Sequence, residues 1–214
     1  MARELIFTRH GESTVNVTRT ITNGPNDYAP LTDLGRSQAQ QLADGLQARD
    51  VIAIYASPLM RARETAGIIG EALGLPVALE DGLREPYCGI AEGRSDDEAW
   101  AMHYRASMEW RAGDVDYRIP NGESLRDVRN RFVPVVEKAV ATHEGENGTV
   151  VLVSHGSVLM HMLLEILPNL TPDFVAANPL RNCDYIVVAV TDAGLSCVEW
   201  ADKEINREAD STAF

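Results

Sequence analysis

The sequence predicts an α/β fold: a three-layer sandwich in which helices flank a mostly parallel central sheet. Short runs that are apolar at every position recur along the chain, and segments with helical stripes of apolar residues lie between them. A length of 214 residues suits one domain. The alternation is interrupted once by a polar segment, which we expect to form a helical insertion that covers the candidate site at one end of the sheet.

Three apolar runs, at residues 3–8, 51–56 and 149–153, are predicted to be strands. Strands that are apolar at every position are buried on both faces, as in a parallel sheet that is covered by helices. Residues 184–190 and 195–200 are predicted to close the sheet as a hairpin.

Capping residues followed by apolar stripes predict the helices. Thr32 can cap one helix, and Ser57, which precedes a proline, is a typical start for another. Ser124, with an aspartate three residues later, forms a capping-box pattern that opens a long helix, which Pro134 is expected to kink. A last helix is expected to follow Gly156.

The segment at 86–121 breaks this alternation. Ser95, with a glutamate three residues later, predicts a helix that runs to about Trp110. We expect residues 1–202 to form a single domain with 86–121 as a lid-like insertion. Residues 203–214 are polar and are expected to form a C-terminal tail.

Composition excludes several classes of partner. A formal net charge of −13 argues against nucleic acid or an anionic membrane surface, although a local arginine cluster can still bind a small anion. No apolar run approaches the ~18 residues that span a bilayer, and the N-terminus lacks the apolar core that a signal peptide needs. Cys88, Cys183 and Cys197 form neither a disulfide framework nor a metal-binding pair. We therefore expect a cytoplasmic protein, with a homodimer left open.

Residues that carry chemistry follow the predicted strands. Arg9 and His10 come directly after the first strand, and His155 follows a later strand in the same way. Ligands of open parallel sheets bind beyond the carboxyl ends of the strands, so the two histidines are expected to meet in one cleft. Arg61 lies in the first turn of the next helix at that edge, and Glu85 lies where the insertion leaves the domain.

Two imidazoles, two guanidiniums and one carboxylate suit phosphoryl transfer. Arginine forks match phosphate oxygens and never lose their charge at ordinary pH. A neutral imidazole can attack phosphorus, and the phosphohistidine that forms divides one difficult step into two easier ones. The leaving alkoxide is basic, so a carboxylic acid is needed to protonate it. The arginines already supply positive charge, and no metal-ligand spacing is found, so we expect neither a metal nor a cofactor.

The pattern RHGES at 9–13 resembles the signature of the histidine phosphatase superfamily, which includes the cofactor-dependent phosphoglycerate mutases. The resemblance continues in order through LTDLGRSQA at 31–39, SPLMRARETA at 57–66, LRE at 83–85, NGES at 121–124 and SHG at 154–156. It implies that the phosphate-accepting nucleophile is His10 and that the proton donor is Glu85. It also implies a phosphate pocket of Arg9, Arg61 and His155, in which the second histidine takes part in catalysis.

Two asparagines match the family less firmly. Asn16 corresponds to a position that contacts the phosphate or its surroundings, and Asn182 is expected near the rim of the pocket. The other histidines, His103, His143 and His161, are expected to be surface or core residues because they show no metal-ligand spacing.

The resemblance favours the phosphatase branch over mutase activity. Where a mutase places an arginine and a tyrosine after its catalytic glutamate, this chain has Pro86 and Cys88, and a mutase lysine corresponds most nearly to Asp96. We therefore expect hydrolysis of a small phosphorylated metabolite. Phosphoglycerate mutase activity remains an alternative because the insertion contains further arginines: Arg94, Arg105, Arg111 and Arg118.

A catalytically weak module that binds phosphorylated ligands is a further alternative. The aromatic and methionine residues of the insertion can line a substrate lid or form its own small core, and the sequence favours neither. These residues are Trp100, Met102, Tyr104, Met108 and Trp110.

Overall fold

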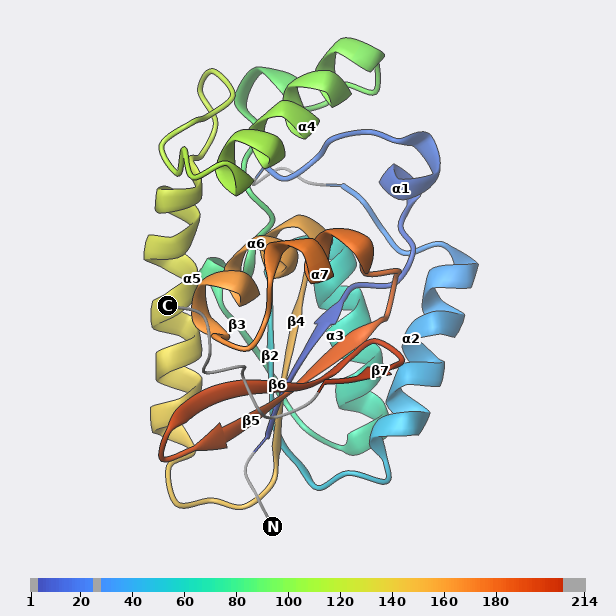
Figure 1. Cartoon of the computed structure of the whole chain (residues 1–214). Helices are drawn as coiled ribbons and strands as arrows, with labels where there is room; N and C mark the ends of the chain where they lie inside the picture. The colour runs from blue at the N-terminus through green and yellow to red at the C-terminus, as the bar shows by residue number, and fades with distance from the viewer. Residues whose placement is uncertain (1–3, 25–27, 206–214) are drawn as a thin grey trace.

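In the part of the chain that the computed structural model describes, residues 4–24 and 28–205, one sheet has the strand order β3-β2-β4-β1-β5-β6-β7 (Figure 1). The strands are β1 (Glu4–Arg9), β2 (Val51–Ala56), β3 (Val77–Leu79), β4 (Thr149–Ser154), β5 (Tyr185–Thr191), β6 (Gly194–Trp200) and β7 (Lys203–Glu204). β3, β2, β4 and β1 run parallel, whereas β5, β6 and β7 continue the sheet in antiparallel fashion. The predicted parallel core and closing hairpin are confirmed.

The register of β1 and β4 determines where the site forms. The two strands pair in parallel from Glu4 with Thr149 to Arg9 with Ser154. The residues that follow them, His10 and His155, therefore leave the sheet side by side, as the sequence predicted.

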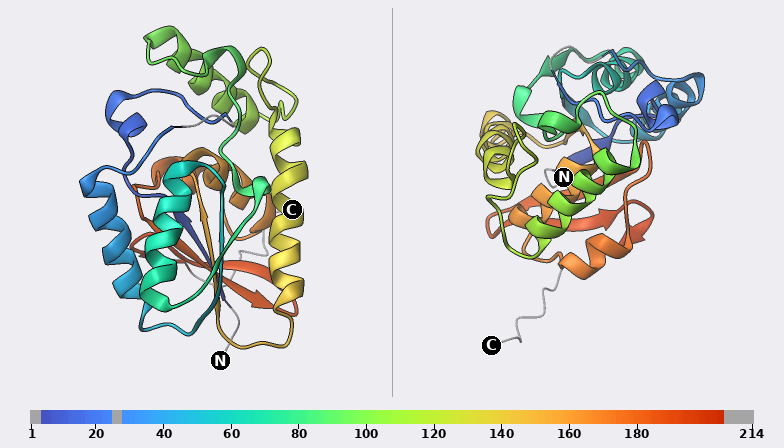
Figure 2. Two further views of the ribbon diagram at one scale, coloured as in Figure 1. Left: turned by 180° about the vertical axis from the view of Figure 1, so that it is seen from behind. Right: turned by 90° about the horizontal axis from the view of Figure 1, so that it is seen from above.

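Helices cover both faces of the sheet (Figures 1 and 2). They are α1 (Thr14–Thr18), α2 (Asp33–Leu46), α3 (Met60–Leu73), α4 (Asp97–Arg111), α5 (Leu125–Thr142), α6 (Gly156–Ile166) and α7 (Pro172–Ala177), with short 3-10 turns η1 (Asp81–Leu83) and η2 (Gly89–Ala91). Ile6 of β1 belongs to the apolar cluster of α2 and α3, whereas its neighbours Leu5 and Phe7 belong to that of α5 and α6. The three-layer sandwich is confirmed.

Two predicted caps are confirmed and two helix starts were placed wrongly. Thr32 and Ser124 accept hydrogen bonds from backbone N–H groups in the first turns of α2 and α5. By contrast, α3 begins at Met60 with Leu59 at its N-cap position, and the Ser57 hydroxyl lies 2.8 Å from the imidazole of His155. The helix of the insertion is capped by Asp96 rather than by the preceding serine.

α4 lies beyond the edge at which β1 and β4 end (Figure 1). It is joined to the body of the domain by a hydrogen bond of 2.7 Å from the Trp100 indole to the Arg19 carbonyl and by a contact of 2.9 Å between Ser107 and His161 of α6. At the other end of the chain, the first residues of the expected tail form β7, and residues 206–214 lie outside the described part.

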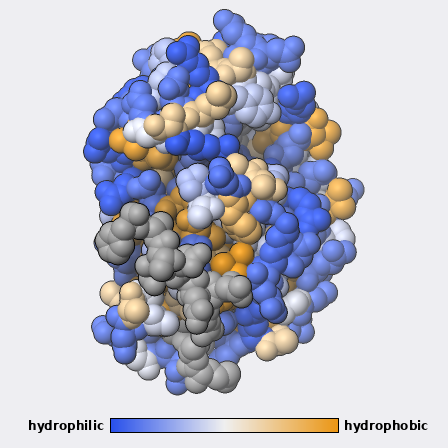
Figure 3. All heavy atoms as spheres, in the orientation of Figure 1, coloured by the Kyte–Doolittle hydropathy of each residue, from blue (hydrophilic) through white to orange (hydrophobic). Residues whose placement is uncertain are grey.

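The face seen in Figure 3 is mostly hydrophilic, with hydrophobic side chains grouped in a few places. Among the described helices, we find no segment that combines the length and the apolar character needed to cross a membrane.

Candidate active site

His10 lies in the turn after β1 with only 3% of its surface exposed. Its Nδ1 is 2.7 Å from the Gly11 carbonyl, which can only accept a hydrogen bond, so Nδ1 carries the proton and Nε2 keeps its lone pair. Burial, followed by the charges of Arg61 and Arg9, holds the pKa of His10 well below 6.5. The imidazole is therefore neutral at pH 7, as a nucleophile must be.

The glycine after His10 is required by close packing. A Cβ at Gly11 would lie 2.5 Å from the Gly35 carbonyl of α2, so any larger residue would push the turn away from that helix. Its N–H donates to Thr65 of α3 at 3.0 Å. The turn that presents His10 is thus fixed between two helices.

Arg61, in the first turn of α3, is 4% exposed and faces His10. Its Nε–H donates to His10 Nε2 at 3.1 Å, and its two terminal nitrogens donate to the Thr22 carbonyl and to Asn23 Oδ1 at 2.9 Å each. The guanidinium is therefore held in one orientation by fixed acceptors.

Asn23 was not found from the sequence because no motif surrounds it. It is 6% exposed, its amide donates to the Pro86 carbonyl at 3.0 Å, and its backbone N–H donates to Glu92 at 2.7 Å. It therefore connects Arg61 to the loop that carries Glu85.

Arg9 lies against the first residue of α6. A Cβ at Gly156 would be 3.4 Å from Arg9 Nε, which is an ordinary van der Waals distance, so the guanidinium packs directly against this residue. Arg9 Nη1 donates to the Leu180 carbonyl at 2.7 Å, whereas Nε is buried without a hydrogen-bond partner among the described residues. Burial lowers the pKa of this arginine, and the nearby Glu85 opposes that shift.

His155 is fully buried, and its ring meets that of His10 edge-on at 5.0 Å between centroids. Its Nε2 lies 2.8 Å from the Ser57 hydroxyl, which accepts a hydrogen bond from Leu59 N–H, and its Nδ1 has no partner in the described part of the chain. Burial, then the charge of Arg61, keeps the pKa of His155 well below 6.5. Both histidines are therefore uncharged at pH 7.

Glu85 is held at the N-terminus of α6. Its carboxylate accepts hydrogen bonds from the backbone N–H groups of Ser157 and Val158 at 3.0 and 2.8 Å. Unpaired N–H groups make a helix N-terminus a natural site for a carboxylate. Arg131 fixes the backbone of the same loop, because it donates to the Glu85 carbonyl at 3.3 Å and forms an ion pair with Glu123 at 2.8 Å.

The two asparagines brace the turn that carries His10. Asn182 donates to the His10 carbonyl at 2.9 Å and approaches Asn16 Oδ1 at 3.4 Å. Asn16 Oδ1 also accepts from the backbone N–H and the hydroxyl of Ser13, each at 3.0 Å. Asn16 lines the cavity described below, and Asn182 lies behind it.

A cavity of about 450 Å³ opens at this edge of the sheet. Its walls include five of the predicted site residues: Arg9, His10, Asn16, Arg61 and Glu85. His155 lies next to His10 and does not line the cavity. The volume is that of a typical small-molecule site, which buries a ligand much larger than a phosphate ion.

The far wall of the cavity corrects one expectation. His103 and His161, expected to be surface or core residues, both line the cavity, as do Trp100 and Tyr104. Trp110 is instead buried in the large apolar cluster that also includes residues of β1, α5 and α6.

The insertion arginines fall into two groups. Arg94, Arg105 and Arg118 form ion pairs with acidic neighbours, whereas Arg111 lines the cavity and has no ion pair among residues 4–24 and 28–205.

Cys88 is buried, and burial raises the pKa of its thiol, so it is not poised as a nucleophile.

A neutral histidine beside two arginines, at the edge where parallel strands end, is the kind of site that suits phosphoryl transfer. The sequence matches the histidine phosphatase superfamily (branch 1) over residues 5–203, and the chain belongs to that family. It is 31% identical to glucosyl-3-phosphoglycerate phosphatase of Mycolicibacterium vanbaalenii over 192 residues, which cover 87% of this chain and 84% of that protein. It is 32% identical to a protein of Yersinia enterocolitica named probable phosphoglycerate mutase GpmB, over 84% of this chain and 81% of that one.

Solved structures agree with these relatives. Bacillus stearothermophilus YhfR superposes with a TM-score of 0.79 and 32% identity over 96% of this chain and 99% of its own. A mycobacterial glucosyl-3-phosphoglycerate phosphatase gives a TM-score of 0.79 and 28% identity, over 95% of this chain and all of its own. The family expected from the sequence is therefore confirmed, and with it a phosphomonoesterase of the histidine phosphatase type.

Proposed function

We propose that the protein hydrolyses a small phosphorylated metabolite through a phosphohistidine on His10. One observation carries the proposal: a buried, neutral imidazole with its Nε2 lone pair toward Arg61, at the end of a cavity that fits a metabolite. Arg9 Nε, which lines the cavity and has no partner among the described residues, is a further donor that we assign to a phosphate oxygen. We also assign His155 Nδ1 to the phosphoryl group, which it meets only when that group is bonded to His10, because His155 is buried beside His10 and does not line the cavity.

In the first step, the phosphoryl group enters between Arg61 and His10. Arg61 Nε–H then donates to a phosphoryl oxygen in place of His10 Nε2, which frees the lone pair of that nitrogen. His10 Nε2 attacks phosphorus, and the bond from phosphorus to the ester oxygen breaks. Glu85, as the carboxylic acid, gives its proton to that oxygen so that the product leaves as an alcohol. Arg9, Arg61 and the N–H of His155 stabilise the negative charge on the phosphoryl oxygens.

In the second step, a water molecule takes the place of the alcohol. The Glu85 carboxylate removes a proton from this water, and its oxygen attacks the phosphorus of the phosphohistidine. The bond from phosphorus to His10 Nε2 breaks, inorganic phosphate leaves, and Glu85 is protonated again for the next cycle.

Hydrolysis is favoured over mutase activity by the residues after Glu85. The mutase cations are replaced by Pro86, whose carbonyl accepts from Asn23, and by Asp96, which caps α4. Arg111 is the observation that favours the alternative, because it offers a cation within the cavity, and one relative carries a mutase name. A side-by-side assay of phosphate release and of 3- to 2-phosphoglycerate conversion decides between them.

We propose that neither a metal nor a cofactor takes part. The described residues form no group of three or more histidine, cysteine or acidic side chains that could hold an ion. The guanidiniums of Arg9 and Arg61 supply the positive charge that a metal would otherwise provide. We propose no nucleic-acid partner, since the chain carries a net charge of −13.

A further inference from the structure

One face of α4 forms the roof of the cavity beyond the phosphate end. The lining residues on this helix recur at intervals of three and four: Trp100, His103, Tyr104, Ser107 and Arg111. Such spacing places them along one side of the helix, over a length of about 16 Å at 1.5 Å per residue. The residues of α6 that line the cavity are Gly156, Ser157, Met160 and His161.

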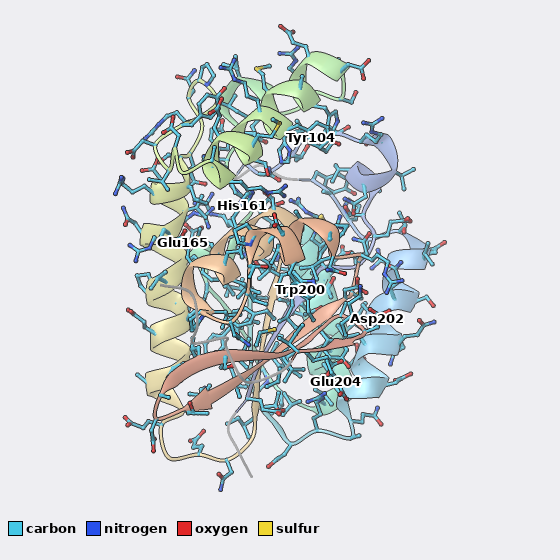
Figure 4. All side chains as sticks on the ribbon, viewed as in Figure 1. Tyr104, His161, Glu165, Trp200, Asp202 and Glu204 are labelled. Atoms are coloured by element: carbon cyan, nitrogen blue, oxygen red, sulfur yellow. The ribbon has the colours of Figure 1, made fainter. Side chains whose placement is uncertain are left out.

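Where α4 faces α6, the wall of the cavity is polar but uncharged. His161, labelled in Figure 4, is 5% exposed. Its Nε2 lies 2.9 Å from the hydroxyl of Ser107 on α4. Burial first, then the nearby charge of Arg111, lowers the pKa of His161 to about 4. At neutral pH this pair therefore offers hydrogen bonds without a charge.

His103 adds a second uncharged imidazole, one helical turn from Ser107. Its Nδ1 is buried without a hydrogen-bond partner among the described residues, and burial lowers its pKa. Its ring meets those of Trp100 and Tyr104 edge-on, at 5.3 and 5.9 Å between centroids. Buried polar atoms in proteins are nearly always paired, so this nitrogen is available to pair with a bound group.

These groups match hydroxyls better than carboxylates. A neutral imidazole and a serine hydroxyl each both donate and accept hydrogen bonds, as a substrate hydroxyl does, whereas a carboxylate only accepts and is bound best by a cation. The indole and phenol rings on the same wall offer apolar surface to the C–H groups of a compact ring.

The distance between the phosphate end of the cavity and His161 indicates the size of the substrate. Glu85 is bonded to the backbone of Ser157, and His161 lies four residues further along α6, about 6 Å along the helix axis. The hydroxyls must therefore lie well beyond the leaving oxygen, at a distance that a sugar ring spans.

We propose that His103, Ser107 and His161 form a hydroxyl-binding subsite, so that the substrate is the phosphate ester of a polyhydroxylated compound of sugar size. This inference rests on the proposed hydrolysis at His10, because it concerns the alcohol part of the same substrate.

The test measures kcat/KM for hexose and pentose phosphates, 3-phosphoglycerate and p-nitrophenyl phosphate, which has no hydroxyls. We expect a sugar phosphate to exceed 3-phosphoglycerate by tenfold or more. Ser107→Ala and His161→Gln should each lower kcat/KM for that sugar phosphate about five- to tenfold, through KM, and change p-nitrophenyl phosphate less than twofold. Met108→Ala is the matched control, because Met108 is adjacent to Ser107 and 68% exposed.

Equal losses on both substrates would overturn the subsite, as would a preference for 3-phosphoglycerate that Arg111→Met removes. Calorimetry on His10→Ala measures sugar phosphate binding without turnover, and adding Ser107→Ala should weaken that binding by a similar factor. If the wild-type protein releases no phosphate from p-nitrophenyl phosphate, the proposed hydrolysis is refuted. Calorimetry then still tests the subsite, because it measures whether Ser107→Ala weakens sugar phosphate binding without any turnover. Hydrolysis without a preference for sugars refutes the subsite alone.

Discussion

Replacing Glu85 by glutamine separates proton donation from binding. The carboxylate accepts two N–H groups of α6, at 3.0 and 2.8 Å, and a glutamine amide keeps one acceptor oxygen and turns an NH₂ group toward the other N–H. The lost hydrogen bond should reduce the free energy of unfolding by about 1 kcal/mol, which leaves the fold intact. Loss of the transferable proton is the larger effect, because general acids contribute roughly 10²- to 10⁴-fold.

The assay compares kcat/KM for an alkyl phosphate and for p-nitrophenyl phosphate on wild type and Glu85→Gln. We expect a loss of about a hundredfold or more with the alkyl ester and a much smaller loss with the nitrophenyl ester, whose leaving group needs little protonation. Glu109→Gln, on the same edge of the domain but outside the cavity lining, serves as control and should behave as wild type. If both esters lose activity by the same factor, Glu85 binds or positions the substrate and the mechanism is wrong.

Three further predictions follow from the same geometry. Asn23→Ala removes the Oδ1 acceptor that Asn23 offers to Arg61 Nη2 and should lower kcat/KM about tenfold or more, with wild-type circular dichroism as the check on folding. Because folding lowers the pKa values of His10 and His155, the unfolded chain binds more protons than the folded chain below about pH 6.5. The urea concentration at the midpoint of unfolding should therefore fall as the pH decreases from 6.5. A midpoint that stays constant or rises would contradict buried neutral histidines. Treatment with chelators should leave the rate of p-nitrophenyl phosphate hydrolysis unchanged, and loss that added zinc or magnesium restores would show that a metal takes part.

Much of the site was predictable because it depends on local signals and on one topological rule. Arg9, His10 and His155 follow strands that are recognisable from their apolar runs, and parallel strands end at a common edge. The position of Arg61 could be predicted because this residue lies in the first turn of the helix that follows β2. For these residues, sequence position alone determines which end of the sheet they reach.

The rest depends on contacts between segments far apart in sequence. Asn23 contacts Arg61 across 38 residues, and Ser57 contacts His155 across 98, with no pattern around either residue to indicate the partner. His103 was taken for a surface or core residue because its role depends on how α4 docks over α6. The regular spacing of polar and aromatic residues on α4 was the signal that could have indicated a cavity wall.

The proposed mechanism requires that His10 carries the phosphoryl group during turnover. Rapid quenching of the enzyme with a ³²P-labelled sugar phosphate, or with labelled p-nitrophenyl phosphate, tests it directly. We expect a phosphoprotein that is labile in acid and stable in base, with the label on His10, formed and consumed at least as fast as phosphate is released. Absence of any label in wild type, or His10→Ala protein that retains full turnover, would contradict it.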